Sequence, residues 1–475
     1  MLWKASILLF SIFFVVSLSK SPDMVVVLSR HGAREPLKSN FDDSWKNPTY
    51  LMDVGVEQHY TLGSVLAKKY SHLLKDITAQ EIYIQTTYSS RTHMSISAQL
   101  LGLFGGRSHK HQEQQNPEDF KFPYANDVLV NEVVKDLLGG SSPVPNGLQF
   151  LPQKTHSRYK EDLLQISPNN CQFVNKTQDE RFQDEENKNI EVLLNDTFTE
   201  LQALGYNVKD MSEMKEFGDT LASRYADNKP PLDGIPYNGK LYNDTVFGFK
   251  WWNIYNLMGD AYERALKVFP LYNVYTKWFT NKAQGKTPLK LVLLGGHESS
   301  MFPFLNLYNI TNHTCFSENY RSQLDELPLP YPDCKMPEVA STLIYEFYNN
   351  SGSPYVRLLY NGKPFKLCRN SKGMQCDLDD FVNELPEVTF NLTQKKWDKV
   401  CATKKSGSSK SISNAIASMS SSGDEKILTI VIGLLGILIG LIIYLFLSKR
   451  MVLSNQYKGI NQRSPTEIIH STKAF

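Results

Sequence analysis

Three short runs along the chain have the hydrophobic pattern of buried strands. Residues 24–28 are entirely apolar, and residues 81–86 and 289–294 are rich in β-branched or aliphatic side chains. Runs of this length are typical of a parallel sheet covered on both faces. Residues 55–70 and 95–104 follow the first two runs and carry apolar side chains at helical spacing. This alternation predicts an α/β fold with a mostly parallel sheet flanked by helices.

The middle of the chain has a different pattern. Residues 109–239 are polar, with helical stretches such as 190–204 and no strand as clear as the first two. The simplest architecture is an α/β core formed by residues 20–108 and 280–401, split by a mostly helical insertion at 109–279. Two separate domains are the alternative, but each half would then lack a complete sheet.

A short apolar run lies close to the start. Lys4 precedes the mostly apolar residues 5–16, and the small residues Ser17 and Ser19 follow on either side of Leu18. This is the pattern of a secretory signal peptide over residues 1–19. A retained signal anchor is the alternative, although the run is short for a hydrocarbon core of ~30 Å.

Residues 427–447 carry no charge and are long enough to form one transmembrane helix. A GPI signal would end at its hydrophobic tail, whereas Lys449 and Arg450 follow here and indicate the cytoplasmic side. We expect a serine-rich stalk at 402–426 and a cytoplasmic tail at 448–475. The pattern predicts a single-pass type I membrane protein with its bulk in the lumen or outside the cell.

Glycosylation sequons and cysteines agree with a lumenal placement, because all of them lie between the two hydrophobic segments. The seven sequons are at Asn175, Asn195, Asn243, Asn309, Asn312, Asn349 and Asn391. The six cysteines are Cys171, Cys315, Cys334, Cys368, Cys376 and Cys401. Their even number and the absence of a zinc-like spacing favour disulfides.

Net charge and the sequence of the tail indicate which kinds of partner the protein binds. A formal net charge of +2 argues against a nucleic-acid-binding protein. In the tail, Tyr457 and Ile460 have the spacing of a sorting signal read by clathrin adaptors, a loose pattern that a short tail can contain by chance. We therefore favour the lysosome or endosome over the plasma membrane.

Ionisable side chains follow each of the three predicted strands. They are Arg30, His31 and Arg34 after the first, Arg91 after the second, and His297 and Glu298 after the third. Ligands of open α/β sheets bind at the carboxyl ends of strands. Guanidinium groups match the oxygens of phosphate, so the pattern predicts a phosphoryl site. A chance basic turn or a surface patch for lipid headgroups is the alternative.

Four segments resemble one known family, the histidine acid phosphatases of branch 2 of the histidine phosphatase superfamily. RHGAREP (30–36) matches the RHGxRxP signature, and GVEQHYTLG (55–63) is similar to the family's GMxQHYxLG helix. SSRTHMSISAQ (89–99) and GGHESS (295–300) resemble two further family segments. The resemblance extends over about residues 24–401.

The resemblance implies a covalent mechanism that needs no metal or other cofactor. His31 would attack the phosphorus of a small phosphate monoester. Arg30, Arg34, Arg91 and His297 would hold the phosphoryl oxygens. Glu298 would protonate the leaving oxygen and later activate water. Because clustered arginines keep His31 neutral and Glu298 must be protonated, an acid optimum is expected.

Three positions depart from the family pattern. Glu298 stands where aspartate is more common, Gln85 where arginine is usual, and Ser90 where an acidic residue precedes the catalytic arginine. The alternatives are therefore a phytase-like or lipid-phosphate phosphatase and a catalytically weak receptor or adhesion glycoprotein. A site for inositol phosphates would need further cations around the phosphoryl site. The candidates are Arg107, Lys110 and Lys121. The simpler interpretation is that these three side chains form a solvent-exposed face.

The same resemblance implies how the cysteines pair and leaves a homodimer open. Cys171–Cys401 and Cys368–Cys376 resemble two family disulfides. Cys334 has a family counterpart, and its partner here is expected to be Cys315.

Overall fold

The computed structural model describes residues 21–38, 40–45, 49–105, 151–334, 336–350 and 352–401. These residues contain an eight-stranded sheet with the strand order β3-β2-β4-β1-β5-β6-β7, and β8 also pairs with β6. Its strands are β1 (Met24–Arg30), β2 (Ile82–Thr86), β3 (Lys154–Thr155), β4 (Leu291–Gly296), β5 (Thr342–Asn350), β6 (Ser353–Tyr360), β7 (Lys363–Phe365) and β8 (Gln375–Asp377).

The three predicted strands form the parallel half of the sheet. β1 and β2 both pair in parallel with β4, and β3 extends this half beyond β2. Every residue of β1 and β4 is buried. Strands covered on both faces read as continuous apolar runs, which is why the pattern detects them.

The expected mostly parallel sheet is wrong, because β5 to β8 are antiparallel. β5 pairs antiparallel with β1, and β6 pairs antiparallel with β5, β7 and β8. Antiparallel neighbours need only a short turn, and β6 reaches β7 through Asn361 and Gly362, whose φ angles are 48° and 78°. An Asn-Gly pair with two positive φ values is the favoured two-residue hairpin turn. The sheet is therefore mixed.

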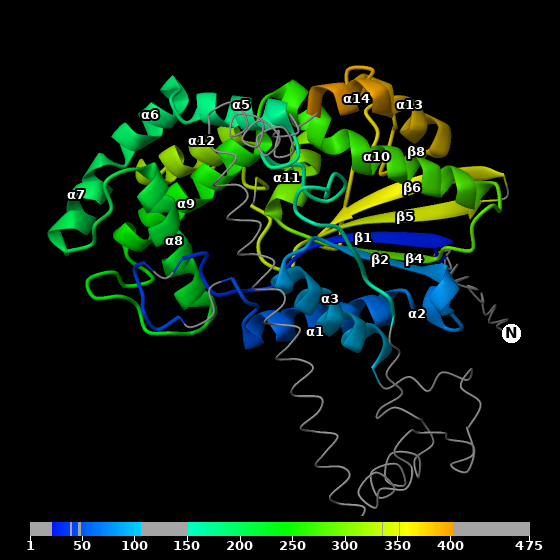
Figure 1. Ribbon diagram of the computed structural model, residues 1–475, viewed down its shortest axis with the longest axis horizontal. Coiled ribbons are helices and arrows are strands. Elements are labelled where there is room, and N and C mark those ends of the chain that lie inside the picture. Colours follow the sequence, from blue (N-terminus) through cyan, green and yellow to red (C-terminus); the bar gives the residue numbers. More distant parts are fainter. Residues whose placement is uncertain are drawn as a thin grey trace, which may run out of the picture. The chain divides into compact units, whose positions relative to one another are not determined.

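Helices cover both faces of this sheet, which confirms the α/β fold (Figure 1). One face of β1 presents Val25 and Val27 to α1 (Asp53–Lys69) and α3 (Ser90–Phe104). The other face presents Met24, Val26 and Leu28 to α10, α11 and α13. The alternation follows from the two-residue period of a strand. The elements on this second face are α10 (Ala261–Ala283), α11 (Glu298–Leu307) and α13 (Leu378–Val388).

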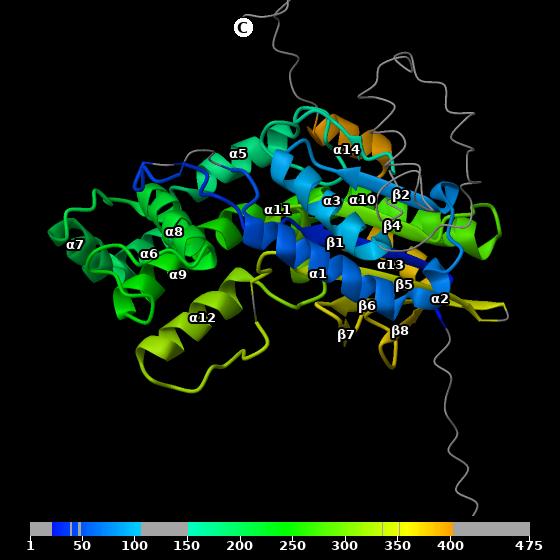
Figure 2. The same ribbon diagram turned by 90° about the horizontal axis from the view of Figure 1, so that it is seen from below.

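A group of helices gathers beside one end of the sheet (Figures 1 and 2). It has its own apolar core, which includes Leu194, Met214, Phe217 and Trp251. The predicted helical stretch 190–204 forms two helices that meet at Leu194. The group contains α6 (Glu185–Leu193), α7 (Asn195–Ala203), α8 (Met211–Ala226), α9 (Lys240–Met258) and α12 (His313–Leu324). The remaining helices are α2 (Ser71–Leu74), α5 (Gln172–Arg181), α14 (Gln394–Cys401) and the short 3-10 turn η1 (Ala79–Glu81).

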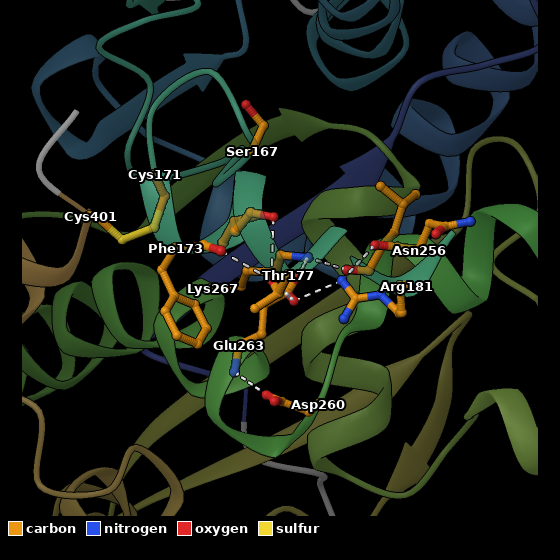
Figure 3. Close-up of polar contacts among 12 residues, drawn as sticks. Ser167, Cys171, Phe173, Thr177, Arg181, Asn256, Asp260, Glu263, Lys267 and Cys401 are labelled. Atoms are coloured by element: carbon orange, nitrogen blue, oxygen red, sulfur yellow. Dashed lines mark hydrogen bonds and ion pairs between the residues drawn. A yellow bond between two sulfur atoms is a disulfide. The ribbon is translucent and has the colours of Figure 1, made fainter. Parts of the chain in front are cut away.

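A buried polar cluster joins α5 to α10 (Figure 3). The carboxylate of Glu263 is fully buried and accepts hydrogen bonds from Thr177 and Arg181 of α5, both at 2.7 Å. Lys267, one turn further along α10, donates to the same carboxylate at 2.5 Å. The Cys171–Cys401 disulfide lies beside the cluster and ties α5 to α14.

The structure forms three disulfides, and they are the three pairs that the resemblance implies: Cys171–Cys401, Cys315–Cys334 and Cys368–Cys376. Among the helices of the described ranges, none combines the length and the apolar character needed to cross a membrane. The predicted signal peptide (1–19), stalk (402–426), transmembrane helix (427–447) and tail (448–475) lie outside these ranges.

Candidate active site

The six residues predicted from the strand ends converge at the carboxyl ends of β1, β2 and β4. His31 directly follows β1 and is only 3% exposed. Its backbone N–H donates to the carbonyl of Gly296 at the end of β4, at 3.0 Å. Its carbonyl accepts from the N–H of Ala340 at 3.1 Å. These two bonds fix the backbone of His31 between β4 and the segment that precedes β5.

The turn after His31 rests on α1 and α3. The N–H of Gly32 donates to the Ser95 hydroxyl at 3.0 Å, and the N–H of Ala33 donates to the Gln58 side chain at 2.9 Å. A Cβ added to Gly32 would lie 2.5 Å from the carbonyl oxygen of Gly55. The turn therefore requires glycine, because the backbone of α1 approaches it too closely for any side chain.

The imidazole of His31 has a defined tautomer. Its Nδ1 lies 2.8 Å from the carbonyl oxygen of Gly32. A carbonyl only accepts, so Nδ1 carries the proton and Nε2 keeps a free lone pair. Burial, followed by the positive charge of nearby groups, with Arg91 the largest contributor among them, holds the pKa of His31 well below its usual value. His31 is therefore a neutral ring whose Nε2 keeps the lone pair that a nucleophile needs.

His297 lies beside His31, with 5.3 Å between the ring centroids. Its Nδ1 lies 3.2 Å from a guanidinium nitrogen of Arg91, which only donates. Nε2 therefore carries the proton and donates to the Thr87 hydroxyl at 2.8 Å. Burial and three nearby arginines hold the pKa of His297 well below its usual value. Two neutral imidazoles thus share this end of the sheet with three guanidiniums.

The arginines beside His31 are held by fixed acceptors. Arg34 makes a bidentate pair with Asp219 of α8, at 2.9 and 2.8 Å. Burial alone would lower the pKa of Arg34, but the Asp219 carboxylate outweighs it and raises the value. Arg30 donates to the carbonyl of Pro337 at 2.6 Å and forms an ion pair with Glu298. Burial and neighbouring arginines lower the pKa of Arg91 to about 10.

Three buried donors in this site lack a partner. Among the described residues, nothing accepts a hydrogen bond from the Nε atoms of Arg30, Arg34 and Arg91. An unsatisfied buried donor costs about 1–3 kcal/mol. The guanidinium groups of the same three arginines lie close enough to His31 for their charge to lower its pKa. This concentration of positive charge beside one imidazole fits the binding of an anion such as a phosphoryl group. We call Arg30, Arg34, Arg91 and His297 the cradle.

Glu298 is the first residue of α11 and its side chain is 15% exposed. A carboxylate is stabilised at a helix N-terminus, and here it also pairs with Arg30. Glu298, Arg30 and Arg34 line a cavity of about 610 Å³, so the carboxyl group can reach a molecule bound there.

Two of the departures from the family pattern do not bear on the cradle directly. The Gln85 side chain accepts a hydrogen bond from the Tyr83 hydroxyl at 2.7 Å. Ser90 is exposed at the start of α3. The candidate inositol-phosphate cations Arg107, Lys110 and Lys121 lie outside the described residues, as do Tyr457 and Ile460 of the sorting pattern.

Several positioning residues escaped the sequence analysis. Asp219 lies 185 positions beyond Arg34, and no local motif indicates it. Thr87 is fully buried and orients His297. His59, which belongs to the GVEQHYTLG segment, donates through Nε2 to the carbonyl of Arg30 at 3.0 Å. The resemblance at that segment was the one signal that could have indicated His59.

Comparisons with known proteins establish the family of this chain. The model of the histidine phosphatase superfamily (branch 2) matches residues 42–361, which is more than half of the chain. Human prostatic acid phosphatase is 23% identical over 415 residues, covering 83% of this chain and 92% of the relative. Human lysosomal acid phosphatase is 34% identical over 93 residues, covering 18% of this chain and 22% of the relative. Among solved structures, the phytase from Citrobacter braakii is 14% identical with a TM-score of 0.49, covering 78% of this chain and 98% of that one. The chain belongs to branch 2 of the histidine phosphatase superfamily.

Proposed function

We propose that this phosphatase hydrolyses phosphate monoesters through a covalent phosphohistidine at His31, without a metal ion. The observation that carries the proposal is the free Nε2 of a neutral His31, which lies close to the positively charged side chains of Arg30, Arg34 and Arg91. Those guanidiniums supply the positive charge that a metal supplies in other phosphoryl-transfer enzymes.

The reaction then has two displacements. In the first, Nε2 of His31 forms a bond to phosphorus while the bond to the leaving oxygen breaks, and Glu298 gives that oxygen its proton. In the second, a water molecule attacks the phosphorus, Glu298 takes a proton from it, and the N–P bond breaks. Inorganic phosphate leaves, and both His31 and Glu298 return to their starting states.

Each cradle residue has a role in this scheme. The guanidinium groups of Arg30, Arg34 and Arg91 would donate hydrogen bonds to phosphoryl oxygens and balance their negative charge. His297 is neutral and has both ring nitrogens engaged, with Thr87 and Arg91. It would therefore keep Arg91 in place and present its ring to the phosphoryl group without adding a charge.

The proposal includes a preference for acid. His31 stays neutral in acid because burial and the arginines oppose its protonation. The proton donor in this scheme is a carboxylic acid, and carboxylic acids as a class keep their proton only in acid. Hydrolysis should therefore be fastest on the acid side of neutrality.

The test is the pH profile of hydrolysis. The purified full chain is assayed with p-nitrophenyl phosphate from about pH 3 to 8, beside His31→Ala and the matched control His72→Ala, which removes an exposed histidine of α2. We expect an acid maximum, retained in the control and lost in His31→Ala. A folded wild-type chain that binds phosphate but hydrolyses nothing would instead favour a binding glycoprotein.

We also propose the expected topology and location. Residues 20–108 and 280–401 would form the phosphatase core with an insertion at 109–279, anchored by one helix at 427–447. The relative named lysosomal acid phosphatase supports an endosomal or lysosomal location. Resistance of the full chain to extraction from membranes by alkaline carbonate tests the anchor, and release into the soluble fraction would refute it.

Glycosylation offers a check of the lumenal placement. Five of the sequon asparagines are exposed: Asn175, Asn195, Asn243, Asn309 and Asn391. Asn312 is partly buried, and its side chain caps α12 by accepting from the N–H of Cys315 at 2.8 Å. Asn349 is also partly buried. Glycopeptide mapping should find glycans on the exposed set before Asn312, and a chain without any glycan would contradict a lumenal placement.

A further inference from the structure

The cavity beside the cradle has a wall of aromatic side chains. It begins at Arg30, Arg34 and Glu298 and reaches Tyr225 of α8, Tyr237, and Tyr242 of α9. Further apolar side chains of this wall are Val246, Phe249, Met336 and Val339. The wall comes from α8, α9, the loop between them and the segment before β5, and it lines the same cavity as Arg30 and Arg34 of the cradle.

The three tyrosines form one connected cluster. The Tyr237 ring meets Tyr225 and Tyr242 edge to face, with 5.2 Å between centroids in both pairs. Tyr225 and Tyr242 are 6.0 Å apart. Tyr242 is buried, whereas Tyr225 is 59% exposed. An exposed aromatic side chain beside a cavity offers a flat apolar surface at its mouth.

The charges that line the cavity cancel in pairs. Among its described lining residues the cations are Arg30, Arg34 and Lys250. Arg30 pairs with Glu298, Arg34 with Asp219, and Lys250 with Glu338 at 2.9 Å. A substrate with several phosphates would bring further negative charge to a wall where every described cation already has a carboxylate partner. Burying that charge without a free counter-ion is unfavourable.

We propose that this cavity selects monoesters whose leaving group is an aromatic ring and discriminates against polyphosphorylated substrates such as inositol phosphates. The inference rests on the proposed function and specifies its substrate class. The ring would pack against the edges or faces of Tyr225 and Tyr237 while the phosphoryl group occupies the cradle. Apolar walls with a few placed polar groups are the usual build of a small-molecule site.

Binding of non-hydrolysable analogues tests this selection without depending on turnover. Isothermal titration calorimetry of the full chain would compare phenylphosphonate, methylphosphonate and inositol hexakisphosphate. The variants are Tyr225→Ser and Tyr237→Ser. Because the Tyr237 hydroxyl donates to the carbonyl of Lys229 at 2.8 Å, its loss could disturb the fold, and the more exposed Tyr225 gives the cleaner variant. Tyr60→Ser is the matched control, since Tyr60 is 51% exposed on helix α1 and does not line the cavity.

The wild-type chain should bind phenylphosphonate about tenfold more tightly than methylphosphonate, and inositol hexakisphosphate more weakly than either. Tyr225→Ser should reduce the phenyl preference about threefold to fivefold, and Tyr60→Ser should leave it unchanged. Equal affinity for the two phosphonates, or tighter binding of the hexakisphosphate, would overturn the selection while leaving the phosphatase mechanism intact. Binding of none of the three would count against the cradle itself, and so against both proposals.

Discussion

At the scale of single residues, the site is a set of buried polar groups whose hydrogen bonds fix their protonation. The carbonyl of Gly32 sets the tautomer of His31, and Arg91 and Thr87 set that of His297. Both rings are buried and neutral. Positive charge in the cradle therefore comes from the guanidinium groups alone. The imidazole of His31 stays unprotonated in acid.

Replacing Asp219 should show how much its carboxylate stabilises the buried positive charge of Arg34. Asp219→Asn removes the carboxylate that pairs with buried Arg34. Breaking a buried pair leaves an uncompensated charge and typically costs about 3–5 kcal/mol. We expect urea unfolding to show a loss of that order. Inorganic phosphate should restore part of it, because the anion replaces the missing carboxylate, and should stabilise the variant more than the wild type.

The role of Arg34 is tested by comparing how much inorganic phosphate stabilises Asp219→Asn with how much it stabilises the wild type. A variant as stable as the wild type would mean that the pair contributes nothing. A destabilised variant that phosphate stabilises no more than the wild type would mean that Arg34 does not face the anion.

Protonation of the buried His59 should lower the free energy of unfolding in acid. Burial lowers its folded-state pKa to about 4, from 6.5. A group with a depressed pKa binds its proton more readily in the unfolded chain, so the neutral form stabilises the fold fully above pH 6.5 and that stability is lost as the pH falls toward 4. The difference corresponds to roughly 3 kcal/mol. Unfolding free energies measured between these pH values should fall less steeply in His59→Gln, and an identical slope in the two proteins would contradict this assignment.

At the scale of elements, the hydrophobic pattern predicted the strands that are buried on both faces of the sheet. β1 and β4 are fully buried, so their apolar runs were visible in the sequence. β5 was missed although it is long, because its sequence mixes Thr, Glu and Asn with the apolar residues. Its Glu346 is buried and accepts from the Tyr70 hydroxyl at 2.8 Å, a long-range partner that no local pattern indicates. The Asn361-Gly362 turn was a usable hairpin signal.

That turn supports a matched pair of glycine substitutions. Gly362 has a φ of 78° and open space around its Cβ position, and Gly373 also has open space but no positive φ. Gly362→Ala should destabilise the protein by about 1 kcal/mol, because a side chain is strained at positive φ. Gly373→Ala should be neutral or slightly stabilising. Chemical unfolding measures both, and equal effects would mean that φ at the turn is not the cause.

The cluster around Glu263 should be a main link between α5 and α10 (Figure 3). Glu263→Ala would leave the largely enclosed Arg181 and the buried Lys267 without their shared carboxylate, which should cost about 3–5 kcal/mol. Glu180→Ala is the control, because its pair with Lys176 is mostly exposed and should contribute less than about 1 kcal/mol. Comparable losses of unfolding free energy in the two variants would show that burial of the cluster is not what matters.

At the scale of the whole molecule, the site is assembled from segments that are far apart in the sequence. The residues predicted at three strand ends do meet, because strands of a parallel sheet end at one edge. The partners that hold them were not predictable, since Asp219 and the tyrosine wall belong to α8, α9 and the loop between them, whose sequence carries no phosphate motif. Motifs at the strand ends therefore indicated which residues meet at the site, whereas the residues that position them and line the cavity depended on tertiary packing.

The most direct test of the central claim is the stereochemical course at phosphorus. The full chain would transfer the phosphoryl group of a monoester, made chiral with three oxygen isotopes, to an added alcohol. Two successive in-line displacements through His31 invert the phosphorus twice, so we expect net retention of configuration. Net inversion would mean a single direct transfer with no covalent intermediate, and it would contradict the role proposed for His31.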